Sequence, residues 1–261
     1  MKSLTRTAQF DPKKLSASAR EDLAKALYAV HQQIFEGPGL TEFERRIINP
    51  PSCVSSVQVS RNRDGEIVGY CAVHFFELRQ HNTTIIVMRA QAGMLRAFRG
   101  RNRSMPFTLM KVLAYRLRHP LHPMFFFGAM IHPSSYLLCD KYISHIWPAR
   151  GQSLSYPHLK LVERCIEAFR LPPVNPSNPR VVKVGIRTLD DDADQHYWSH
   201  CDKPAVRFFL EHNPDYQSGN GLVTLIPVSL PGMAVSAWRL VLDRVRRGVS
   251  RWRGRLQLAG G

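Results

Sequence analysis

The sequence predicts an α/β protein with a mixed, mainly antiparallel central sheet flanked by helices, followed by a C-terminal extension. Three observations lead to this prediction. Two helical patterns precede any strand, three strand-like segments then follow one another, and a continuously apolar segment lies between two further helical patterns. The chain has 261 residues, of which 44% are hydrophobic and 21% charged, so it can bury a sizeable core, and global disorder is excluded.

The first part of the chain reads as a tail and two helices. Residues 1–14 are polar, and we expect a loose tail there. Apolar residues recur at steps of three or four over residues 18–34, which predicts a helix that ends at a Gly-Pro-Gly breaker. A second, short helix is expected from Thr41, a helix N-cap residue with an acid three positions later, to the Asn49-Pro-Pro stop.

Three strands are expected next. Residues 54–60 alternate with the strand period, and the Asp64-Gly65 pair is a hairpin signal. Residues 66–78 are rich in Val, Tyr and Phe, and residues 83–92 form a third β-rich segment. An antiparallel run of strands is therefore predicted.

A loop, a helix, a strand and a helix follow. The basic, glycine-containing stretch 96–104 leads into an apolar-periodic helix over residues 106–118, with Pro106 suited to the first turn. Residues 124–131 (MFFFGAMI) read as a strand buried on both faces, and another helix is expected from Pro133.

The remainder gives weaker signals. We expect a helix at 154–169, a proline-rich loop or linker at 171–179, strands at 181–186 and 222–228, a short helix at 206–211 and a basic amphipathic helix at 233–256. The predicted organisation is a tail (1–14), a main domain (15–150), an extension of undefined fold packed on it (151–231) and a basic amphipathic helix with its tail (232–261).

Charge and cysteine content bound the function. Thirty-six Lys and Arg against twenty Asp and Glu give a formal net charge of +16, which favours phosphate-bearing partners: nucleic acid, an anionic membrane or a polyphosphate co-substrate. Five scattered cysteines without a CxxC pair indicate neither a disulfide framework nor a zinc knuckle, and fit a reducing compartment. With no signal-peptide pattern and no apolar span, we expect a cytoplasmic protein, soluble or peripheral at the inner face of a membrane.

The strand, loop and helix over residues 83–118 carry the clearest chemical signal. This stretch holds no acid and eight cations: Arg89, Arg96, Arg99, Arg101, Arg103, Lys111, Arg116 and Arg118. A glycine-bearing loop before a helix presents backbone N–H groups to an anion, and arginines add bidentate contacts to phosphate. A pyrophosphate site is one reading, and a solvated basic face is the other.

A resemblance favours the first reading. Residues 97–104 (AFRGRNRS), between a strand and a helix, resemble the pyrophosphate loop of the GNAT superfamily of acyl-CoA-dependent N-acyltransferases, in which a basic residue precedes two glycines. Arg99 matches the basic residue, whereas Asn102 and Ser104 stand where glycines are usual. Asn tolerates a left-handed backbone and Ser is small.

A second stretch is similar to the same superfamily. Residues 135–142 (SYLLCDKY) match the helix after its fifth strand, and His132 stands where an Asn is common. The tyrosine that often protonates the leaving thiolate aligns with Cys139. Tyr136 and Tyr142 lie three residues to either side, so all three side chains are candidates for the general acid on one face of the helix.

The resemblance covers residues 18–150 and implies a site and an activity. The third long strand and the MFFFGAMI strand would splay apart, with the pantetheine arm of acyl-CoA in the gap against the main chain. The implied co-substrate contacts are Gln91, Ala92, Gly93, Met94 and Leu95 along the strand, and Arg99, Gly100, Arg101, Asn102, Arg103 and Ser104 for the diphosphate. The implied reaction is acyl transfer from acyl-CoA, or an acyl-carrier protein, to an amine on a small molecule or lipid.

That reaction needs a base for the amine proton, and the neighbouring strands offer several. The candidates are Glu77, His74 and, less directly, His81. Each residue also has a purely structural interpretation: His74 as a buried core histidine, and Glu77 as a solvated charge at the rim of the sheet.

Other features allow other functions. The helix at 233–256 suits a membrane surface, an acidic partner, self-pairing or simple packing with a basic outer face. His196, His200 and Cys201 have spacings that a metal can use, but we expect no metal site, and the acidic run at 190–194 reads as a solvated turn. The alternative function is a catalytically inactive GNAT-like fold that binds nucleic acid or anionic membrane.

Overall fold

The computed structural model describes the backbone of residues 4–80, 83–99 and 104–259, and the side chains of these ranges between residues 6 and 248. Its strands are β1 (Leu4–Phe10), β2 (Phe35–Glu36), β3 (Val54–Asn62), β4 (Ile67–Gln80), β5 (Thr83–Met94), β6 (Met124–Met130), β7 (Pro173–Asn175), β8 (Asn178–Lys183), β9 (Arg187–Thr188) and β10 (Asn220–Pro227). Its α-helices are α1 (Ala17–His31), α2 (Leu40–Phe43), α3 (Ser104–Arg118), α4 (Pro133–Tyr142), α5 (Tyr156–Ala168), α6 (Asp192–Ser199), α7 (Pro204–His212) and α8 (Leu230–Ala259). A π-helical turn (Glu44–Ile48) follows α2, and 3-10 turns lie at Pro12–Lys14, Arg96–Phe98 and Tyr216–Ser218.

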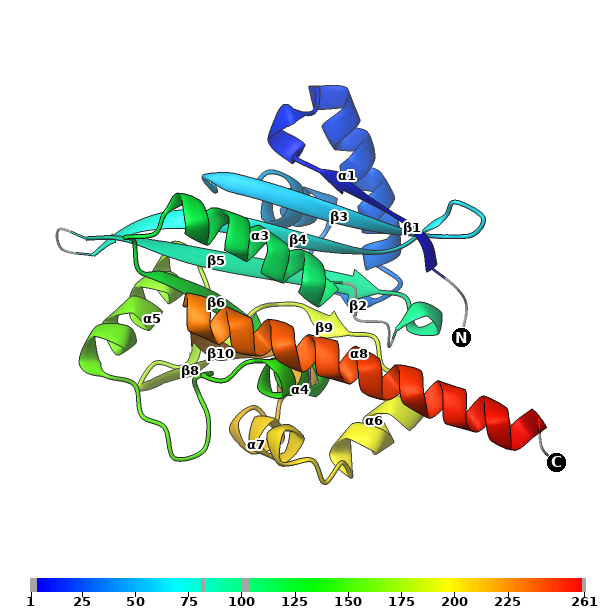
Figure 1. The fold of residues 1–261 in the computed structure, drawn as a ribbon. Helices are drawn as coiled ribbons and strands as arrows, with labels where there is room; N and C mark the ends of the chain where they lie inside the picture. Colours follow the sequence, from blue (N-terminus) through cyan, green and yellow to red (C-terminus); the bar gives the residue numbers. More distant parts are fainter. Residues whose placement is uncertain (1–3, 81–82, 100–103, 260–261) are drawn as a thin grey trace.

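One long sheet forms the centre of the molecule (Figure 1). Its strand order is β1-β3-β4-β5-β6-β10-β8-β7, and β2 and β9 make a separate two-stranded sheet. Every pairing in the long sheet is antiparallel except that of β5 with β6. The prediction of a mixed, mainly antiparallel sheet flanked by helices is confirmed.

Helices cover both faces of this sheet. The strand alternation sends Val57, Val59 and Ala72 to one face, where they pack against α1 and the π-helical turn, and α5 packs further along the same face. Phe75 and Met88 point to the opposite face, which α3 and the start of α8 cover. Helices α4 and α7 pack on the same side as α3, against β6 and β10. The result is a three-layer arrangement with a core on each side of the sheet.

The N-terminus differs from the sequence prediction. Residues 4–10, predicted to be a loose tail, form the edge strand β1, which pairs with β3 from Leu4↔Asn62 to Phe10↔Val57. The segment LTRTAQF alternates apolar and polar residues only weakly, because an edge strand needs few apolar side chains. Its strand conformation comes from the partner rather than from a local pattern.

The C-terminal half is part of the same sheet. Residues 151–231, predicted as an extension packed on a domain of residues 15–150, supply β7, β8 and β10, and β10 pairs with β6 along six residues. No boundary at residue 150 therefore divides the sheet. The proline-rich stretch 171–179, predicted to be a loop, contains β7 and the start of β8. Helix α6, at the acidic run, was not predicted.

Candidate active site

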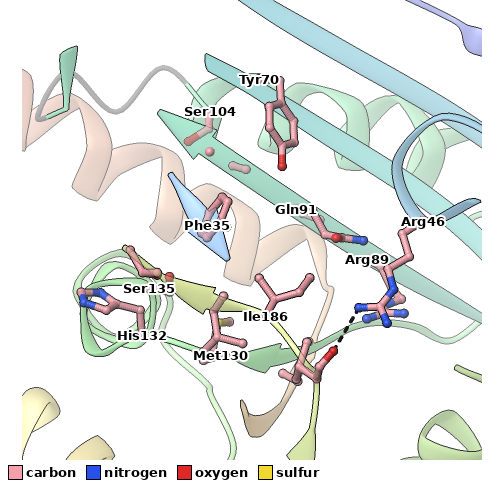
Figure 2. A pocket seen from close by; sticks show the side chains of 18 of the residues that line it. Phe35, Arg46, Tyr70, Arg89, Gln91, Ser104, Met130, His132, Ser135 and Ile186 are labelled. Carbon is pink, nitrogen blue, oxygen red and sulfur yellow. Dashed lines mark hydrogen bonds between the residues drawn. The ribbon is translucent and has the colours of Figure 1, made fainter. Parts of the chain in front are cut away.

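Strands β5 and β6 separate after a short parallel contact. Three pairs join them, from Ile86↔Met124 to Met88↔Phe126. Beyond these pairs β5 continues beside β4, and β6 continues beside β10. The splay predicted between these two strands is thus present, and a cavity of about 920 Å³ is lined by residues of both strands (Figure 2).

One end of the cavity lies at the start of α3. Ser104 and Arg99 line it, and the Nε of Arg99 donates a hydrogen bond to the carbonyl oxygen of Met94 at 3.2 Å. Arg96 also lines it but is paired with Asp191 and Asp194. Four other residues of the predicted diphosphate loop, Gly100, Arg101, Asn102 and Arg103, lie outside the described residues.

The β5 wall agrees in part with the predicted contacts. Gln91, Ala92, Gly93 and Met94 line the cavity. Leu95 is not among its lining residues; its N–H donates to the carbonyl of Val68 at 2.9 Å. Gly93 is one of the implied co-substrate contacts, but a Cβ there would lie 2.8 Å from the ring of Phe35. Its missing side chain therefore leaves room for Phe35, which projects from β2 beside the splay (Figure 2).

A tyrosine and a histidine form a buried polar pair on one side of the cavity. The hydroxyl of Tyr70 (β4) and the Nδ1 of His31 (α1) are 2.8 Å apart, and both residues line the cavity. Burial and then the charge of Arg46 lower the pKa of His31 to about 4, and burial strongly raises the pKa of Tyr70. At neutral pH the pair is therefore an uncharged imidazole beside a protonated hydroxyl.

A serine, a histidine and an aspartate form a second polar group on the other side. His132 precedes α4 as its N-cap, and its Nδ1 lies 2.6 Å from the hydroxyl of Ser134 and 3.2 Å from the backbone N–H of Ser134. Its Nε2 lies 2.8 Å from Asp190, and the side chains of His132 and Asp190 are 5% and 4% exposed. Because the Ser134 N–H donates to Nδ1, the imidazole carries its proton on Nε2 and donates it to Asp190.

Sequence reasoning missed most of these groups. Asp190 was assigned to a solvated turn, yet its side chain is buried against His132, 58 residues away in the chain. His132 was noted only by its alignment position, and Tyr70, His31 and Ser134 were not identified. No short-range pattern links residues that only the sheet and α4 bring together.

The strand arrangement decides the type of fold. The antiparallel run of strands, the splay of β5 from β6 and the basic segment leading into α3 are the features that the sequence resemblance implied, and β5 and β6 also share one short parallel contact. The fold is of the GNAT type.

Solved structures of GNAT-type N-acetyltransferases are similar to this chain at low identity. A ribosomal-protein-alanine N-acetyltransferase from Brucella melitensis biovar Abortus 2308 matches at 13% identity and a TM-score of 0.35, over 58% of this chain and 98% of its own. Arabidopsis thaliana NAA60 in complex with acetyl-CoA matches at 13% and 0.32, over 65% and 86%. Chaetomium thermophilum Naa20 in complex with a bisubstrate analogue matches at 12% and 0.34, over 86% and 87%.

No protein-family profile matches the chain, and no curated protein sequence does either.

The three α4 candidates for the general acid of a GNAT-type site do not line the cavity. Cys139, on α4, is buried, and burial raises the pKa of its thiol to about 12. Tyr136 donates to the carbonyl of Pro148 at 2.6 Å and packs on Phe208, and Tyr142 donates to Asp243 at 2.9 Å. The face of α4 that lines the cavity consists of Ser134, Ser135 and Leu138. The expectation that all three candidates share the cleft is wrong, because this helix face packs on α7 and α8.

The two described base candidates lie on opposite faces of β4. His74 faces the cavity; its Nδ1 lies 2.9 Å from the hydroxyl of Ser55, and burial lowers the pKa of His74 to about 3. Glu77 lies at the cavity margin, three residues further, where alternation turns its side chain to the α3 face. There burial, then the charge of Cys53 and then the charge of Glu77 raise the pKa of Tyr115 to about 12. His81 lies outside the described residues.

The described residues meet neither the requirements of a membrane-spanning helix nor those of a metal site. No helix that they form is long and apolar enough to cross a membrane. No group of three or more His, Cys, Asp or Glu side chains among the described residues is arranged to hold a metal ion. The rings of His196 and His200 contact each other, with their centroids 4.2 Å apart and their planes tilted by 32°.

Proposed function

We propose that the protein transfers an acyl group from an acyl-CoA, or from an acyl-carrier protein, to an amine. The observation that carries this proposal is the splay of β5 and β6, which exposes the main chain of β5 to a cavity reaching from Ser104 to Arg89. A cavity of about 920 Å³ is within the range of small-molecule sites.

The residues present fit the thioester carrier group. From Ala90 to Met94, no strand among the described residues pairs with β5 on its β6 side. The main-chain N–H and C=O groups that point to that side, other than the Met94 carbonyl bound by Arg99, are available to a pantetheine arm. Arg99 and Ser104, at the start of α3, supply a cation and a helix N-terminus for a diphosphate. Direct attack then places the amine and the thioester carbonyl in one cavity, which lowers the barrier through orientation.

Ser134, His132 and Asp190 are proposed to move the proton. As the amine nitrogen bonds to the carbonyl carbon, its proton passes to the Ser134 oxygen while the Ser134 proton passes to His132 Nδ1. The Asp190 carboxylate stabilises the resulting imidazolium. When the carbon–sulfur bond breaks, the same proton returns through Ser134 to the thiolate, so no net proton is gained or lost.

Tyr70 is proposed to hold the thioester oxygen. Its raised pKa keeps the hydroxyl protonated, so it can donate a hydrogen bond to the oxyanion that forms during attack. Gln91, on the neighbouring strand β5, lines the same cavity and can position the substrate (Figure 2).

Ligand binding and thiol release test the proposed function. The melting temperature is measured with CoA and with acyl-CoAs of two to sixteen carbons, since a ligand at 100 times its Kd stabilises by about 2.7 kcal/mol. Thiol release is then measured with a panel of amines, using the wild type and Ser134→Ala. The proposal expects stabilisation by acyl-CoA and turnover that the variant loses. Absence of both binding and turnover would refute it, and stabilisation by nucleic acid alone would favour the inactive alternative.

Peripheral membrane contact belongs to the same proposal. Helix α8 buries Met233 and Leu240 and leaves Trp238, Val241 and Val245 exposed, next to Arg244, Arg246 and Arg247. Exposed apolar side chains beside cations suit an anionic lipid surface. Flotation with phosphatidylcholine vesicles, with and without phosphatidylglycerol, compares the wild type with Trp238→Ser. Equal binding of both proteins to both vesicles would contradict the proposed contact of α8 with anionic lipid.

A further inference from the structure

Arg89 is a cation at the end of the cavity opposite Ser104. It lies on β5, one residue beyond the last β5–β6 pair, and its Cα is in register with that of His74 on β4. Figure 2 shows its guanidinium group beside Arg46, at the other end of the cavity from Ser104. Arg89 thus lies at the point where the splay begins.

No acidic group compensates Arg89. Its guanidinium carbon lies 4.4 Å from the centroid of the Phe169 ring, and among the described residues no carboxylate, carbonyl or hydroxyl oxygen accepts a hydrogen bond from it. Cys165 is close, but burial raises the pKa of this thiol to about 12 and keeps it neutral. Burial, followed by the charge of Arg46, lowers the pKa of Arg89 to about 10. The guanidinium remains charged at neutral pH. The Arg89 side chain is partly buried, and a charge withdrawn from water without a counterion is costly.

The neighbouring arginines, Arg45 and Arg46, have partners of their own. Glu42 accepts hydrogen bonds from the Nε of Arg45 and the Nε of Arg46, each at 2.6 Å, and Arg46 also donates to the carbonyl of Val184 at 3.2 Å. Arg45 and Arg46 therefore have local partners. They add positive potential to the cavity without supplying the anion that Arg89 lacks.

A buried ring nitrogen of His74 also lacks a hydrogen-bond partner beside Arg89. His74 is 1% exposed, and its Nε2 has no hydrogen-bond partner among the described residues. Its Nδ1 is bonded to Ser55, so Nε2 is the atom left for a ligand. A guanidinium and an imidazole on adjacent strands, both facing the cavity, form a built site for an anion.

We propose that Arg89 and His74 bind a carboxylate of the substrate. This inference rests on the proposed acyl transfer and names the chemistry of one of its substrates. The carboxylate belongs either to the acceptor amine, as in an amino acid, or to the far end of the acyl group. The planar guanidinium matches a carboxylate in a two-bond contact, and the surrounding Phe76, Phe169 and Leu171 suit the apolar body that carries it.

Matched substrate pairs test the proposal and separate its two sources. One pair is an amino acid and its carboxamide as acceptors; the other is an acyl-CoA with a terminal carboxylate and an uncharged acyl-CoA of equal length. We expect KM for the carboxylate member of one pair to be at least about tenfold lower, which corresponds to about 1.4 kcal/mol. The pair that shows the preference identifies the source.

Substitution of Arg89 shows whether the preference depends on this residue. In Arg89→Met the preference should disappear, and in the matched control Arg79→Met, which alters an exposed arginine of β4 outside the cavity, it should persist. Equal KM values within both pairs, with turnover intact, would overturn the carboxylate site and leave acyl transfer standing. A preference that survives in Arg89→Met would also overturn it.

A ligand-free measurement and a binding measurement do not depend on turnover. Arg89→Met should raise the melting temperature of the free protein, because it removes an uncompensated, partly buried charge. A purely structural Arg89, needed for its contact with Phe169, would instead give a lower melting temperature, against the proposal. In calorimetric titrations, amino acids and inorganic phosphate are compared as ligands. Amino-acid binding that is lost in Arg89→Met supports the site even if no acyl transfer is found, and binding of phosphate alone contradicts it.

Discussion

At the scale of single residues, His132 has both of its ring nitrogens engaged, one by Ser134 and one by Asp190. This arrangement sets the tautomer and leaves the Ser134 hydroxyl as the group that reaches the cavity. The relay depends on a negative charge at Asp190, because the imidazolium that forms during transfer must be stabilised within a buried site.

Asp190→Asn removes that charge with little change of shape. We expect kcat for acyl transfer to fall by about a hundredfold or more, since general acid–base catalysis contributes roughly 10² to 10⁴. Steady-state kinetics measure the loss, and circular dichroism checks that the fold is kept. A kcat equal to that of the wild type would exclude His132 from the proton pathway.

Cys139, in contrast, is expected to take no part in catalysis. It aligns with a catalytic tyrosine of GNAT enzymes, but it is buried, and burial raises the pKa of its thiol to about 12. Cys139→Ala should therefore leave kcat within about twofold and lower the free energy of unfolding by about 1 kcal/mol. Kinetics and urea unfolding measure the two effects. Loss of turnover in a stably folded variant would return Cys139 to the active site.

At the scale of elements, β2 and β5 are fitted to each other at Gly93. The ring of Phe35 occupies the space that a side chain at position 93 would need. The fit couples the short β2–β9 sheet, formed by Phe35↔Thr188 and Glu36↔Arg187, to the wall of the cavity.

Gly93→Ala tests this fit. The added methyl group would lie 2.8 Å from a Phe35 ring carbon and 3.2 Å from Ile34, so Phe35 must move. We expect a loss of about 1 to 3 kcal/mol in the free energy of unfolding, as for other overpacked sites. Gly39→Ala is the control, because a Cβ there meets nothing within 4 Å. Equal unfolding free energies for the two variants would mean that Phe35 does not occupy this space.

The elements that sequence reasoning predicted are those with strong local patterns. The alternation over β3 and β4, the apolar run of β6 and the periodicity of α3 each follow from neighbouring residues. The edge strand β1 and the short β7 were missed because their conformation depends on partners distant in the chain. The candidate site followed the same rule: the β5 wall was predicted from the resemblance, but the contact between His132 and Asp190 depends on how residues 184–191 fold back onto α4.

At the scale of the whole molecule, two buried histidines make stability depend on pH. The pKa of His31 is lowered to about 4 and that of His74 to about 3, in both cases mainly by burial, from an ordinary value of 6.5. Between 6.5 and these values the unfolded chain binds protons that the folded chain does not. The free energy of unfolding is therefore unaffected by these two groups above pH 6.5 and falls as the pH decreases below it.

Urea unfolding between pH 7 and pH 4.5 measures this effect. Each histidine should contribute a slope approaching about 1.4 kcal/mol per pH unit in the lower part of the range. Since carboxylates also titrate there, the wild type is compared with His74→Gln. The wild type should lose more stability than the variant over the same interval. Parallel losses in the two proteins would show that His74 is accessible to protons in the folded state.

The pairing of β2 with β9 is short, and this affects how easily the two segments separate. Two residue pairs, the adjoining backbone hydrogen bond from Leu189 to Ile34 and the exposed ion pair of Arg187 with Glu36 join these segments, and an exposed ion pair contributes little. The eight-stranded sheet beneath them is joined along many more residues. Amide hydrogens of Phe35 and Thr188 should accordingly exchange with deuterated solvent far sooner than those of β4, which would show that the β2–β9 pair opens locally while the long sheet stays folded.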